Sequence, residues 1–586
     1  MKWQIKPKAP NAFFKKFPEY SPLIVQMLYN RGLKTQQQID EFFNSDYEED
    51  IHDPFLLKGM KKAVKRILKA IEKQEKILIY GDFDADGVCS AAVLFITLKD
   101  LGVQNISTYI PDREKENHGL NEKSIQQAYE NNVNLIITTD CASNDVKEVD
   151  LANSLKMDVI ITDHHQIDGQ MPKTVALINP SQKGDKYPFK GLSGTGVAYK
   201  LACALMSSKG KQNDNLLKKW LLDLVALATV ADVESIIGEN RTLVKYGLGV
   251  LAQTKWLGLK ELMEVSKITP QVNHHSLNGE APLTNLNIYT LGFMLGPRLN
   301  AAGRIGHANT AFRLLTTQDK KEAKELALRL NQKNIKRQSL TTKVFKEVVD
   351  CLDKKIDQGE DFKLIFEGSP DWPIGLVGLI AGKVKDKYCK PTIIYHQRGD
   401  LIHASCRSIS EFDLMSMLKQ CAKFFDYYGG RCGTGGFRMN AKKLNQVKEK
   451  FNQIAEEKMR NVNIDPILEI DKELYLKDVD WKNYDQIHRF APFGKANPEP
   501  RFLVKGLEIS SLRVVGNNGG HLKMALTMFN KDSKIAKNFN AIGFGLGKKI
   551  EEIKKGDLID IVFELIVNKW NGQRDLEMKI IDLKLS

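Results

Sequence analysis

The stretch ILIYGDFDADG, residues 77–87, places three carboxylates directly after a run of four apolar residues. Such a short apolar run is typical of a strand that is buried on both faces of a sheet. Asp82, Asp84 and Asp86 occupy alternate positions at the end of this strand, where their like charges repel one another. A divalent cation holds such carboxylates together. The stretch therefore predicts a metal site at the end of a buried strand.

Two later segments repeat this arrangement. Residues 135–139 (LIITT) lead into Asp140, and residues 159–162 (VIIT) lead into the tripeptide Asp-His-His at 163–165. In an open parallel sheet, ligands bind beyond the carboxyl ends of the strands, which is where these polar residues fall. We therefore expect the three segments to build one metal site in an α/β crevice.

The chain is too long, at 586 residues, for a single core. From about residue 76 to 235, apolar strands alternate with amphipathic helices, which predicts a parallel sheet with helices on both faces. A highly charged segment with a Leu/Val stripe predicts a long helix between domains, and short alternating segments near the end predict a small β-barrel. The predicted parts are a helical segment (1–75), the parallel-sheet domain with a helical extension (76–317), the connecting helix (318–358), a second α/β domain (359–458) and the barrel (459–586).

The charge and the cysteines limit the class of protein. The chain has 86 Lys and Arg residues against 72 Asp and Glu, which gives a net charge of +14. This excess favours a polyanionic partner such as nucleic acid. The alternative is that positive charge spread over a chain of this length serves solubility. The eight cysteines form no C-x-x-C pair and are expected to be reduced thiols. Because the sequence has neither an apolar signal core nor an apolar run of membrane-spanning length, we predict a cytoplasmic protein without a membrane partner.

The acidic run also matches the first half of an EF-hand calcium loop. That loop needs a Glu at its twelfth position, where this chain has Val93, and it follows a helix rather than a strand, so we exclude it. Carboxylates mixed with imidazoles suit Mn²⁺ or Mg²⁺, and the imidazole favours Mn²⁺. The acids outnumber the needs of one ion, so we expect two ions about 3.5–4 Å apart, which activate a water and clamp phosphate oxygens. The expected reaction is hydrolysis of a phosphoester or phosphoanhydride.

One further acid, Asp232, lies in the apolar run 227–233 (LATVADV). A single Asp at the end of a helix is more often a cap or a solvent contact than a ligand. Here the run is so apolar that we expect Asp232 to be buried, and we predict that it is another metal ligand.

Two segments rich in Arg and Gly are predicted to hold the substrate. Residues 296–304 (GPRLNAAGR) combine two arginines with backbone amides, which suits a phosphate group, and the alternative is a structural turn with surface charges. Residues 405–408 and 428–436 form a second cluster, whose glycines allow the backbone to approach a phosphate chain. The predicted substrate-binding residues are Arg298, Asn300, Arg304, Ser405, Arg407, Ser408, Gly429, Gly430 and Arg431.

Together these motifs resemble a known superfamily. The set GDFDADG (81–87), TTDC (138–141), TDHH (162–165) and ATVADV (228–233) is similar to that of the DHH phosphoesterases. Within that superfamily, four further segments resemble the RecJ family of single-strand-specific DNA exonucleases: GPRLNAAGRIG (296–306), ASCRSISEFDL (404–414), YGGRCGTGG (428–436) and APFGKANPEP (491–500).

The resemblance implies a 5′-to-3′ exonuclease that uses Mn²⁺ or Mg²⁺ in DNA repair and recombination. It implies that His165 faces the scissile phosphate, that Asp163 orients the histidines, and that Asp140 takes part in catalysis. It also implies a DHHA1-like substrate-binding domain at 359–458 and an OB-fold in the barrel, where bases would stack on aromatics such as Phe502 or Trp570. A single-strand-binding protein and a helicase are the implied partners, and we expect a monomer. The implied metal ligands are Asp82, Asp84, Asp86, Asp140, His164 and Asp232.

The chain departs from the family pattern at three places. Trp372-Pro373-Ile374-Gly375 stands where Trp-His-Pro-Gly is usual, Arg431 replaces the histidine of Gly-Gly-His, and His118 replaces a tyrosine. Two alternatives therefore stay open. One is a DHH phosphodiesterase for short oligonucleotides or dinucleotides, against which the barrel argues. The other is a non-catalytic replication or repair scaffold, against which the intact set of acids and histidines argues.

Overall fold

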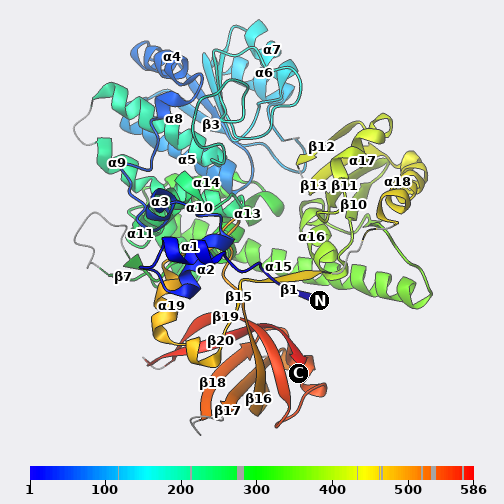
Figure 1. Cartoon of the computed structure of the whole chain (residues 1–586). Helices are drawn as coiled ribbons and strands as arrows, with labels where there is room; N and C mark the ends of the chain where they lie inside the picture. Colours follow the sequence, from blue (N-terminus) through cyan, green and yellow to red (C-terminus); the bar gives the residue numbers. More distant parts are fainter. Residues whose placement is uncertain are drawn as a thin grey trace. The chain divides into compact units, whose positions relative to one another are not determined.

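The computed structural model contains two compact units (Figure 1). One unit comprises residues 46–465, and the other combines residues 1–45 with 466–586. The segment predicted as one helical part, 1–75, is thus shared between the two units. The other predicted domain boundaries stay predictions. The structure describes residues 1–116, 118–210, 214–273, 283–431, 433–460, 462, 466–516, 519–529, 536–570 and 573–586.

A sheet of five parallel strands carries the predicted metal-binding segments, as expected. Two hydrophobic cores lie on opposite faces of this sheet. In strand β2 (Ile77–Tyr80), Ile77 and Ile79 point into one core and Leu78 and Tyr80 into the other, because successive side chains point to opposite faces of a sheet. Both faces are covered, which explains why the strand residues are almost all apolar. The strand order is β3 (Ile106–Tyr109), β2 (Ile77–Tyr80), β4 (Leu135–Thr139), β5 (Asp158–Thr162) and β6 (Ala176–Ile178).

Helices cover both faces of this sheet, so the predicted α/β architecture is confirmed (Figure 1). On one face lie α4 (Met60–Glu72), α5 (Ala85–Asp100) and α8 (Gly194–Lys209). On the other face lie α6 (Glu122–Glu130) and α7 (Val146–Ser154). The α4 helix belongs to this core, which is why the segment after residue 45 packs with the parallel sheet.

A helical extension follows, and its central helix α10 is buried along almost its whole length. The extension includes a π-helix, η2, that runs directly into α13. Among the described residues, no helix is both long enough and apolar enough to cross a membrane. The helices of the extension are α9 (Asp214–Trp220), α10 (Leu222–Ala231), α11 (Gly238–Leu251), α12 (Leu257–Val265), η2 (Thr290–Leu295), α13 (Gly296–Arg304) and α14 (Asn309–Thr316).

The first turn of α10 contains a fully buried acid, Asp223. Its carboxylate accepts hydrogen bonds from the Leu224 amide, the Thr254 hydroxyl and the Trp256 indole. Burial outweighs these donors and raises the pKa of Asp223 to about 7. The charged form of this side chain therefore opposes folding at neutral pH.

We expect Asp223→Asn to remove a pH-dependent contribution to stability. Because the folded-state pKa is raised, protonation of Asp223 favours the folded state below about pH 4, and this contribution is lost as the pH rises through about 7. Between pH 5 and pH 8 the variant should gain stability relative to the wild type by up to about 2.5 kcal/mol, the part of the shift from 3.8 to about 7 that falls in this range. The measurement is the difference in unfolding temperature between the variant and the wild type, at pH 5 and at pH 8, in EDTA. The same difference at both pH values would contradict the prediction.

The long helix α15 (Lys320–Asp357) connects the parallel-sheet domain with a second α/β domain, as the charged segment predicts. Its first half packs through Leu326 and Leu330 into the core of the parallel-sheet domain, and its second half packs through Val348 and Leu352 against α16 (Val377–Tyr388). Helices α17 (Leu414–Gln420) and α18 (Leu444–Met459) cover the opposite face of the second sheet. The strand order there is β12 (Tyr427–Arg431), β13 (Thr434–Asn440), β11 (Leu401–Arg407), β10 (Thr392–Arg398) and β9 (Ile365–Ser369), with only β9 and β10 parallel.

The other unit contains the predicted β-barrel, which is closed. Strand β16 pairs with both β17 and β19, and the pairs β17–β18, β18–β20 and β20–β19 complete the ring. Helices α2 (Pro22–Asn30) and α3 (Gln36–Phe43) share a hydrophobic core with the barrel, beside the short helix α1 (Asn11–Lys16) and the helix α19 (Trp481–His488). The barrel strands are β16 (Phe502–Val515), β17 (His521–Phe529), β18 (Ala536–Gly543), β19 (Leu558–Trp570) and β20 (Gln573–Leu585).

The segment 1–75 contains four α-helices, as expected, but it begins with a strand that was not predicted: β1 (Lys2–Ile5) pairs in parallel with β14 (Ile467–Ile470), a partner that local periodicity cannot reveal. One expectation about this unit is wrong. Phe502 is fully buried in the barrel core, so it offers no face to a base. The side chain of Trp570 lies outside the described residues. The seven described cysteines are free thiols, as predicted.

Candidate metal centre

The turn after β2 begins the site. Asp84 is the N-cap of α5, because its side chain accepts hydrogen bonds from the amides of Asp86 (2.9 Å) and Gly87 (3.1 Å). Such a cap satisfies amides that have no partner within the helix. The cap starts α5 at Ala85 and holds the acidic turn in a fixed conformation.

Asp86 links this turn to a second helix. Its two carboxylate oxygens accept hydrogen bonds from the amides of Gly194 (2.7 Å) and Thr195 (2.8 Å), the first two residues of α8. The positive end of the helix dipole favours the ionised carboxylate there. Gly194 is required beside the acids, since a Cβ at this position would lie 2.4 Å from Asp140 Oδ1.

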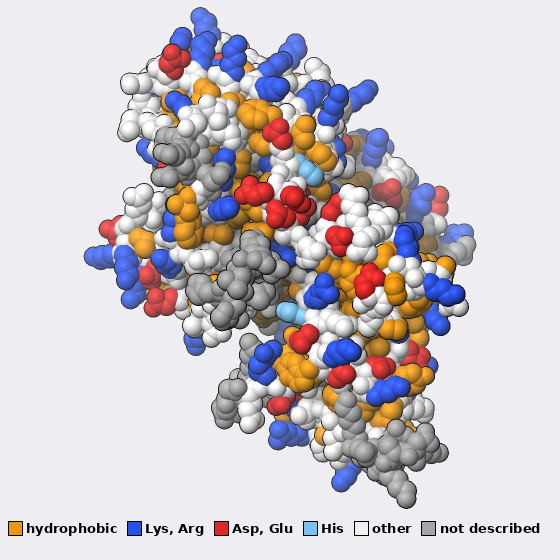
Figure 2. Space-filling model, turned by 60° about the vertical axis from the view of Figure 1, so that its left-hand side comes forward, with side chains coloured by type: hydrophobic (Ala, Val, Ile, Leu, Met, Phe, Trp, Pro, Cys, Tyr) orange, Lys and Arg blue, Asp and Glu red, His pale blue; other side chains and the backbone are white. Residues whose placement is uncertain are grey.

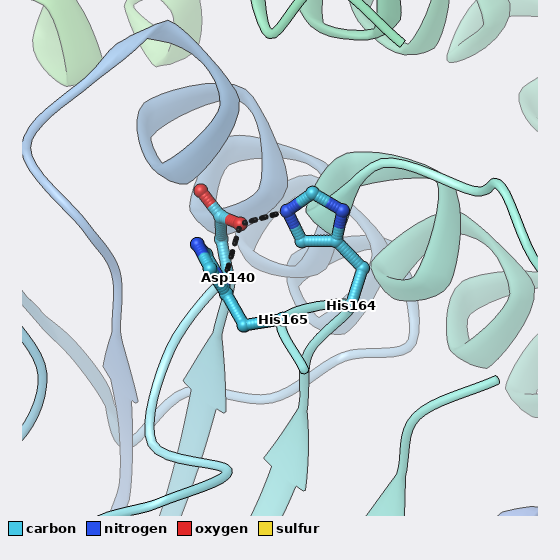
Figure 3. A group of neighbouring side chains, drawn as sticks. All are labelled: Asp140, His164 and His165. Carbon is cyan, nitrogen blue, oxygen red and sulfur yellow. Dashed lines mark ion pairs between the residues drawn. The ribbon is translucent and has the colours of Figure 1, made fainter. Parts of the chain in front are cut away.

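The remaining ligand candidates converge on His164. Its Nε2 atom lies 3.2 Å from Asp140 Oδ1, 3.6 Å from Asp232 Oδ2 and 3.9 Å from Asp86 Oδ2. Figure 3 shows both imidazoles, His164 and His165, beside the Asp140 carboxylate. The six predicted metal residues are thus brought together from the ends of β2, β4, β5 and α10. Three groups have ligand atoms within 4.8 Å of one another: Asp140, His164 and His165; Asp86, His164 and Asp232; and Asp82, Asp84 and Asp140.

Four buried atoms of this centre have no hydrogen-bond partner among the described residues. They are Asp82 Oδ1, Asp140 Oδ1, His164 Nε2 and Asp232 Oδ2. A buried polar atom without a partner is costly, so a native structure has a reason to retain it. Oxygen and imidazole nitrogen atoms that face one another in this way fit divalent cations such as Mn²⁺ and Mg²⁺.

The electrostatics of the centre support the same conclusion. Burial and the nearby carboxylates of Asp86 and Asp84 raise the pKa of Asp140 well above its usual range, and burial with the same two acids raises the pKa of Asp232 to about 9.

Asp140 also has a left-handed backbone conformation with φ of 62°, which is uncommon outside glycine. Such strain persists where the surroundings hold a residue in place for a function.

Asp163 holds the second imidazole. It accepts hydrogen bonds from the amides of Ser143 (3.0 Å), His164 (2.7 Å) and His165 (3.1 Å), and its Oδ1 lies 2.8 Å from His165 Nδ1. Burial alone would raise the pKa of Asp163, but His165 and these donors hold it far below its usual range. The permanent carboxylate places the proton of neutral His165 on Nδ1 and leaves Nε2 free to accept a hydrogen bond.

We expect Asp163→Asn to lower the rate of strand hydrolysis about 10- to 100-fold, the usual cost of losing a residue that orients a site imidazole. The amide removes the charge that selects the His165 tautomer, whereas Mn²⁺ affinity should change little because Asp163 is outside the three candidate ligand groups. Single-turnover rates and calorimetric Mn²⁺ titration measure the two effects. Asp158→Asn, at the other end of β5, is the matched control. A large loss of Mn²⁺ affinity would instead make Asp163 a ligand.

Several predicted substrate residues lie in a cluster of arginines. Burial together with Arg113 and Arg337 lowers the pKa of Arg304 to about 9, and burial lowers the pKa of Arg407, to which Arg113 also contributes. Arg304 donates to the Gly375 carbonyl (3.1 Å), and Arg407 donates to the Ser405 hydroxyl (3.1 Å). No carboxylate within ion-pair distance of these guanidinium groups is found among the described residues. Like charges held together in this way suit an anion such as a phosphate.

Other predicted substrate residues are engaged within the protein. Arg298 donates to Asn331 Oδ1 (3.0 Å), Asn300 Oδ1 accepts from the Ala85 amide (2.9 Å), and Ser408 donates to the Phe412 carbonyl (2.8 Å). These contacts fix α13 against α15 and α5, and they fix the turn after β11. A role of these three residues in substrate binding stays a prediction.

The glycine-rich hairpin brings Arg431 into the metal centre. Gly429 and Gly430 are strand residues of β12, and a Cβ on Gly430 would meet the Thr434 carbonyl at 2.3 Å, so close strand pairing explains at least this glycine. Arg431 Nη2 lies 3.1 Å from His165 Nε2, to which it donates. Its Nη1 atom lies 3.8 Å from Asp232 Oδ2. The second α/β domain therefore contributes a guanidinium group to the centre.

Sequence reasoning missed three further residues. Glu234 Oε1 lies 3.5 Å from His164 Nδ1 and 3.6 Å from Arg431 Nη1. Arg113 belongs to the arginine cluster, and Gly194 starts α8 beside the acids. Only Gly194 has a local signal, the sequence Ser-Gly-Thr-Gly at 193–196, which is typical of a close approach at the start of a helix.

His118, noted as a departure from the family pattern, also lies at the centre. Its Nδ1 atom is 3.1 Å from Asp82 Oδ1, and its ring contacts that of His165 with centroids 5.1 Å apart. Burial would lower the pKa of His118, but the Asp82 carboxylate raises it to about 9. A protonated imidazole therefore adjoins the acids in place of a neutral phenol.

Comparison with known protein families and relatives agrees with this geometry. Residues 76–229 match the family described as "DHH family, N-terminal domain", and residues 470–582 match "RecJ OB domain". The single-stranded-DNA-specific exonuclease RecJ of Bacillus subtilis is 36% identical over 97% of this chain and 68% of its own length. The protein of the same name from Escherichia coli is 28% identical over 96% of both chains.

Solved structures share the fold. The crystal structure of RecJ in complex with Mn²⁺ from Thermus thermophilus superposes with a TM-score of 0.82 at 24% identity, over 100% of this chain and 80% of that one. A crystal structure of exonuclease RecJ bound to manganese superposes with a TM-score of 0.57 at 27% identity, over 70% of this chain and 98% of that one. The likeness extends over both units.

Proposed function

From its membership of the RecJ family of single-stranded-DNA-specific exonucleases, which the B. subtilis relative establishes for this chain, we propose that it removes nucleotides from the 5′ end of single-stranded DNA with two divalent cations. The observation that carries the proposal is the set of four buried, unpartnered atoms that face one another at the ends of the strands and α10. A catalytically inactive scaffold has no reason to retain this costly arrangement.

We assign the cations to the six carboxylate and imidazole residues that meet at His164, namely Asp82, Asp84, Asp86, Asp140, His164 and Asp232. Mn²⁺ or Mg²⁺ bound there would supply an activated water and neutralise charge on the reacting phosphate. The protein holds these ligands rigidly, because Asp84 and Asp86 cap helices and Asp140 is fixed at the end of a buried strand.

The remaining residues hold the strand and its charge. Arg113, Arg304 and Arg407 would bind a phosphate of the strand, since their side chains already lie together without carboxylate partners. His165, oriented by Asp163, donates no proton from Nε2 in its neutral form and therefore accepts the hydrogen bond of Arg431. When a phosphate enters, Arg431 can turn its other guanidinium nitrogens to the phosphate oxygens.

The polyanionic substrate also fits the surface charge. The net charge is +14, and Figure 2 shows Lys and Arg side chains spread over the face in view rather than gathered in one patch. Diffuse positive charge attracts nucleic acid without regard to sequence. The OB-type barrel would also bind single-stranded DNA. We further propose a monomer that acts in the cytoplasm in repair and recombination, with a single-strand-binding protein and a helicase as partners.

The test is cleavage of an oligodeoxynucleotide labelled at either end, as a single strand and as a duplex, in Mn²⁺. We expect mononucleotides released from the 5′ end of the single strand alone. Release from the 3′ end would reverse the proposed polarity. Cleavage confined to oligomers of a few nucleotides would instead favour a small-substrate phosphodiesterase, and binding of strand and metal without cleavage would favour a scaffold.

A further inference from the structure

Two aromatic side chains, Tyr289 and Phe293, stack on each other in solvent next to the metal centre. Their ring centroids are 5.2 Å apart with an interplanar angle of 16°, and the residues are 63% and 67% exposed. Large aromatic side chains seldom remain this exposed, because they are among the residues that gain most from burial. We call this pair the aromatic platform.

Phe293 belongs to the π-helix η2 that leads into α13, and Tyr289 is the residue directly before η2. π-Helical turns are rare, and they occur frequently at functional sites. This one packs directly on the end of α10: a Cβ on Gly292 would lie 3.2 Å from Val230 Cγ1, and one on Gly296 would lie 3.2 Å from Ala231 Cβ. The next residue of the chain is the ligand candidate Asp232, so the helix that carries the platform packs beside the metal centre.

The helix also relates the platform to the phosphate cluster. Phe293 lies in η2, which continues without a break into α13, and α13 ends at Arg304. In α13, Asn300 caps α5 at Ala85, and Arg304 belongs to the arginine cluster. The eleven residues from Phe293 to Arg304 span at most roughly 16 Å along the helix axis, which is the length of two to three nucleotides of an extended strand. The helix that carries Phe293 thus leads to the phosphate cluster.

We propose that the aromatic platform binds an unpaired nucleobase of the substrate strand by stacking, within two or three nucleotides of the phosphate held by Arg304. This inference rests on the proposed function, because it takes the strand as the occupant. A base stacks on an aromatic ring through its π-face whatever its identity, so the platform holds the strand without reading its sequence. A paired base has both faces covered by its neighbours and cannot stack there, which favours single strands.

The experiment measures binding of the full chain to an oligodeoxynucleotide in EDTA, so that hydrolysis plays no part. The strand carries one abasic site, moved one position at a time from the 5′ end. For the wild type, we expect the abasic site to weaken binding most at one or two positions. Removing both rings by Tyr289→Ala with Phe293→Ala should weaken binding of the intact strand about 5- to 150-fold, from the usual worth of one stacked base. The position-specific effect of the abasic site should vanish in the variant.

Two controls isolate the platform. Tyr129→Ala removes an exposed tyrosine from α6 and should leave binding unchanged, whereas Tyr289→Phe with Phe293→Trp keeps two stacking rings and should bind as the wild type does. If the position-specific abasic penalties persist in the double alanine variant, or if the wild type itself shows the same penalty at every position, the platform holds no base. Wild-type cleavage in Mn²⁺ is scored separately, so a chain that shows the position-specific effect but does not cleave would refute the proposed function and leave the platform in place.

Discussion

Replacing Asp140 by Asn should reduce hydrolysis of single-stranded DNA by at least about 1,000-fold, because even a residue that only supports a metal ligand is worth 10- to 100-fold. Asp140 belongs to two of the three ligand groups, and its Oδ1 atom is one of the four that lack a hydrogen-bond partner. The amide keeps the shape of the side chain but removes the negative charge that a cation needs. Single-turnover cleavage at saturating strand and Mn²⁺ measures the loss.

The same substitution should make the metal-free chain more stable at pH 8. Burial and the neighbouring acids raise the pKa of Asp140, so its ionised form opposes folding once the pH exceeds its unfolded-state value. Unfolding temperatures in EDTA and in Mn²⁺ should therefore move in opposite directions relative to the wild type. Asp145→Asn is the control for the metal, because this acid accepts a hydrogen bond from the Leu120 amide (2.7 Å) and is outside the ligand groups. Burial raises the pKa of Asp145 to about 6, so this variant should also be more stable at pH 8, but its unfolding temperature should move in the same direction in EDTA and in Mn²⁺. Full activity of Asp140→Asn would show that Asp140 is not a metal ligand.

The parallel sheet and its acidic edge could be predicted because short, continuous stretches of sequence determine both. A strand buried on both faces must be apolar throughout, so runs such as 135–139 stand out from their surroundings. The rule that ligands bind at the carboxyl ends of parallel strands then places Asp140 beside His164 without knowledge of the remaining contacts. Asp232 follows for a similar reason, since the second half of α10 is almost entirely apolar and carries the next residue toward the interior.

Residues that reach the centre through tertiary contacts could not be predicted in this way. Glu234 lies in an ordinary turn, and its place between His164 and Arg431 depends on how the second domain folds over the first. Asn300 shows the same difficulty. Its side chain accepts a hydrogen bond from the Ala85 amide at the start of α5, more than two hundred residues away in the chain, a contact that only the folded structure reveals, while its role in substrate binding stays a prediction.

We expect Arg431→Ala to lower the rate of hydrolysis about 100- to 1,000-fold, the range for removing one donor that stabilises charge in a transition state. Arg431 is anchored on β12, and it lies within 3.1 Å of His165 Nε2. Its guanidinium has more donors than this one contact uses, and a phosphate between the domains would receive the others in the fork geometry that arginine provides. Arg431→His, which restores the residue usual in the family, should retain more activity than alanine.

Metal affinity separates this role of Arg431 from a structural one. The guanidinium lies 3.8 Å from Asp232 Oδ2, so its positive charge competes with a cation for the same carboxylate. Arg431→Ala should therefore bind Mn²⁺ more tightly than the wild type while it cleaves more slowly. Calorimetric titration and single-turnover rates give the two quantities, with Arg398→Ala, an exposed residue at the end of β10, as the control. If both quantities fall together, Arg431 supports the fold of the centre and does not act on the phosphate.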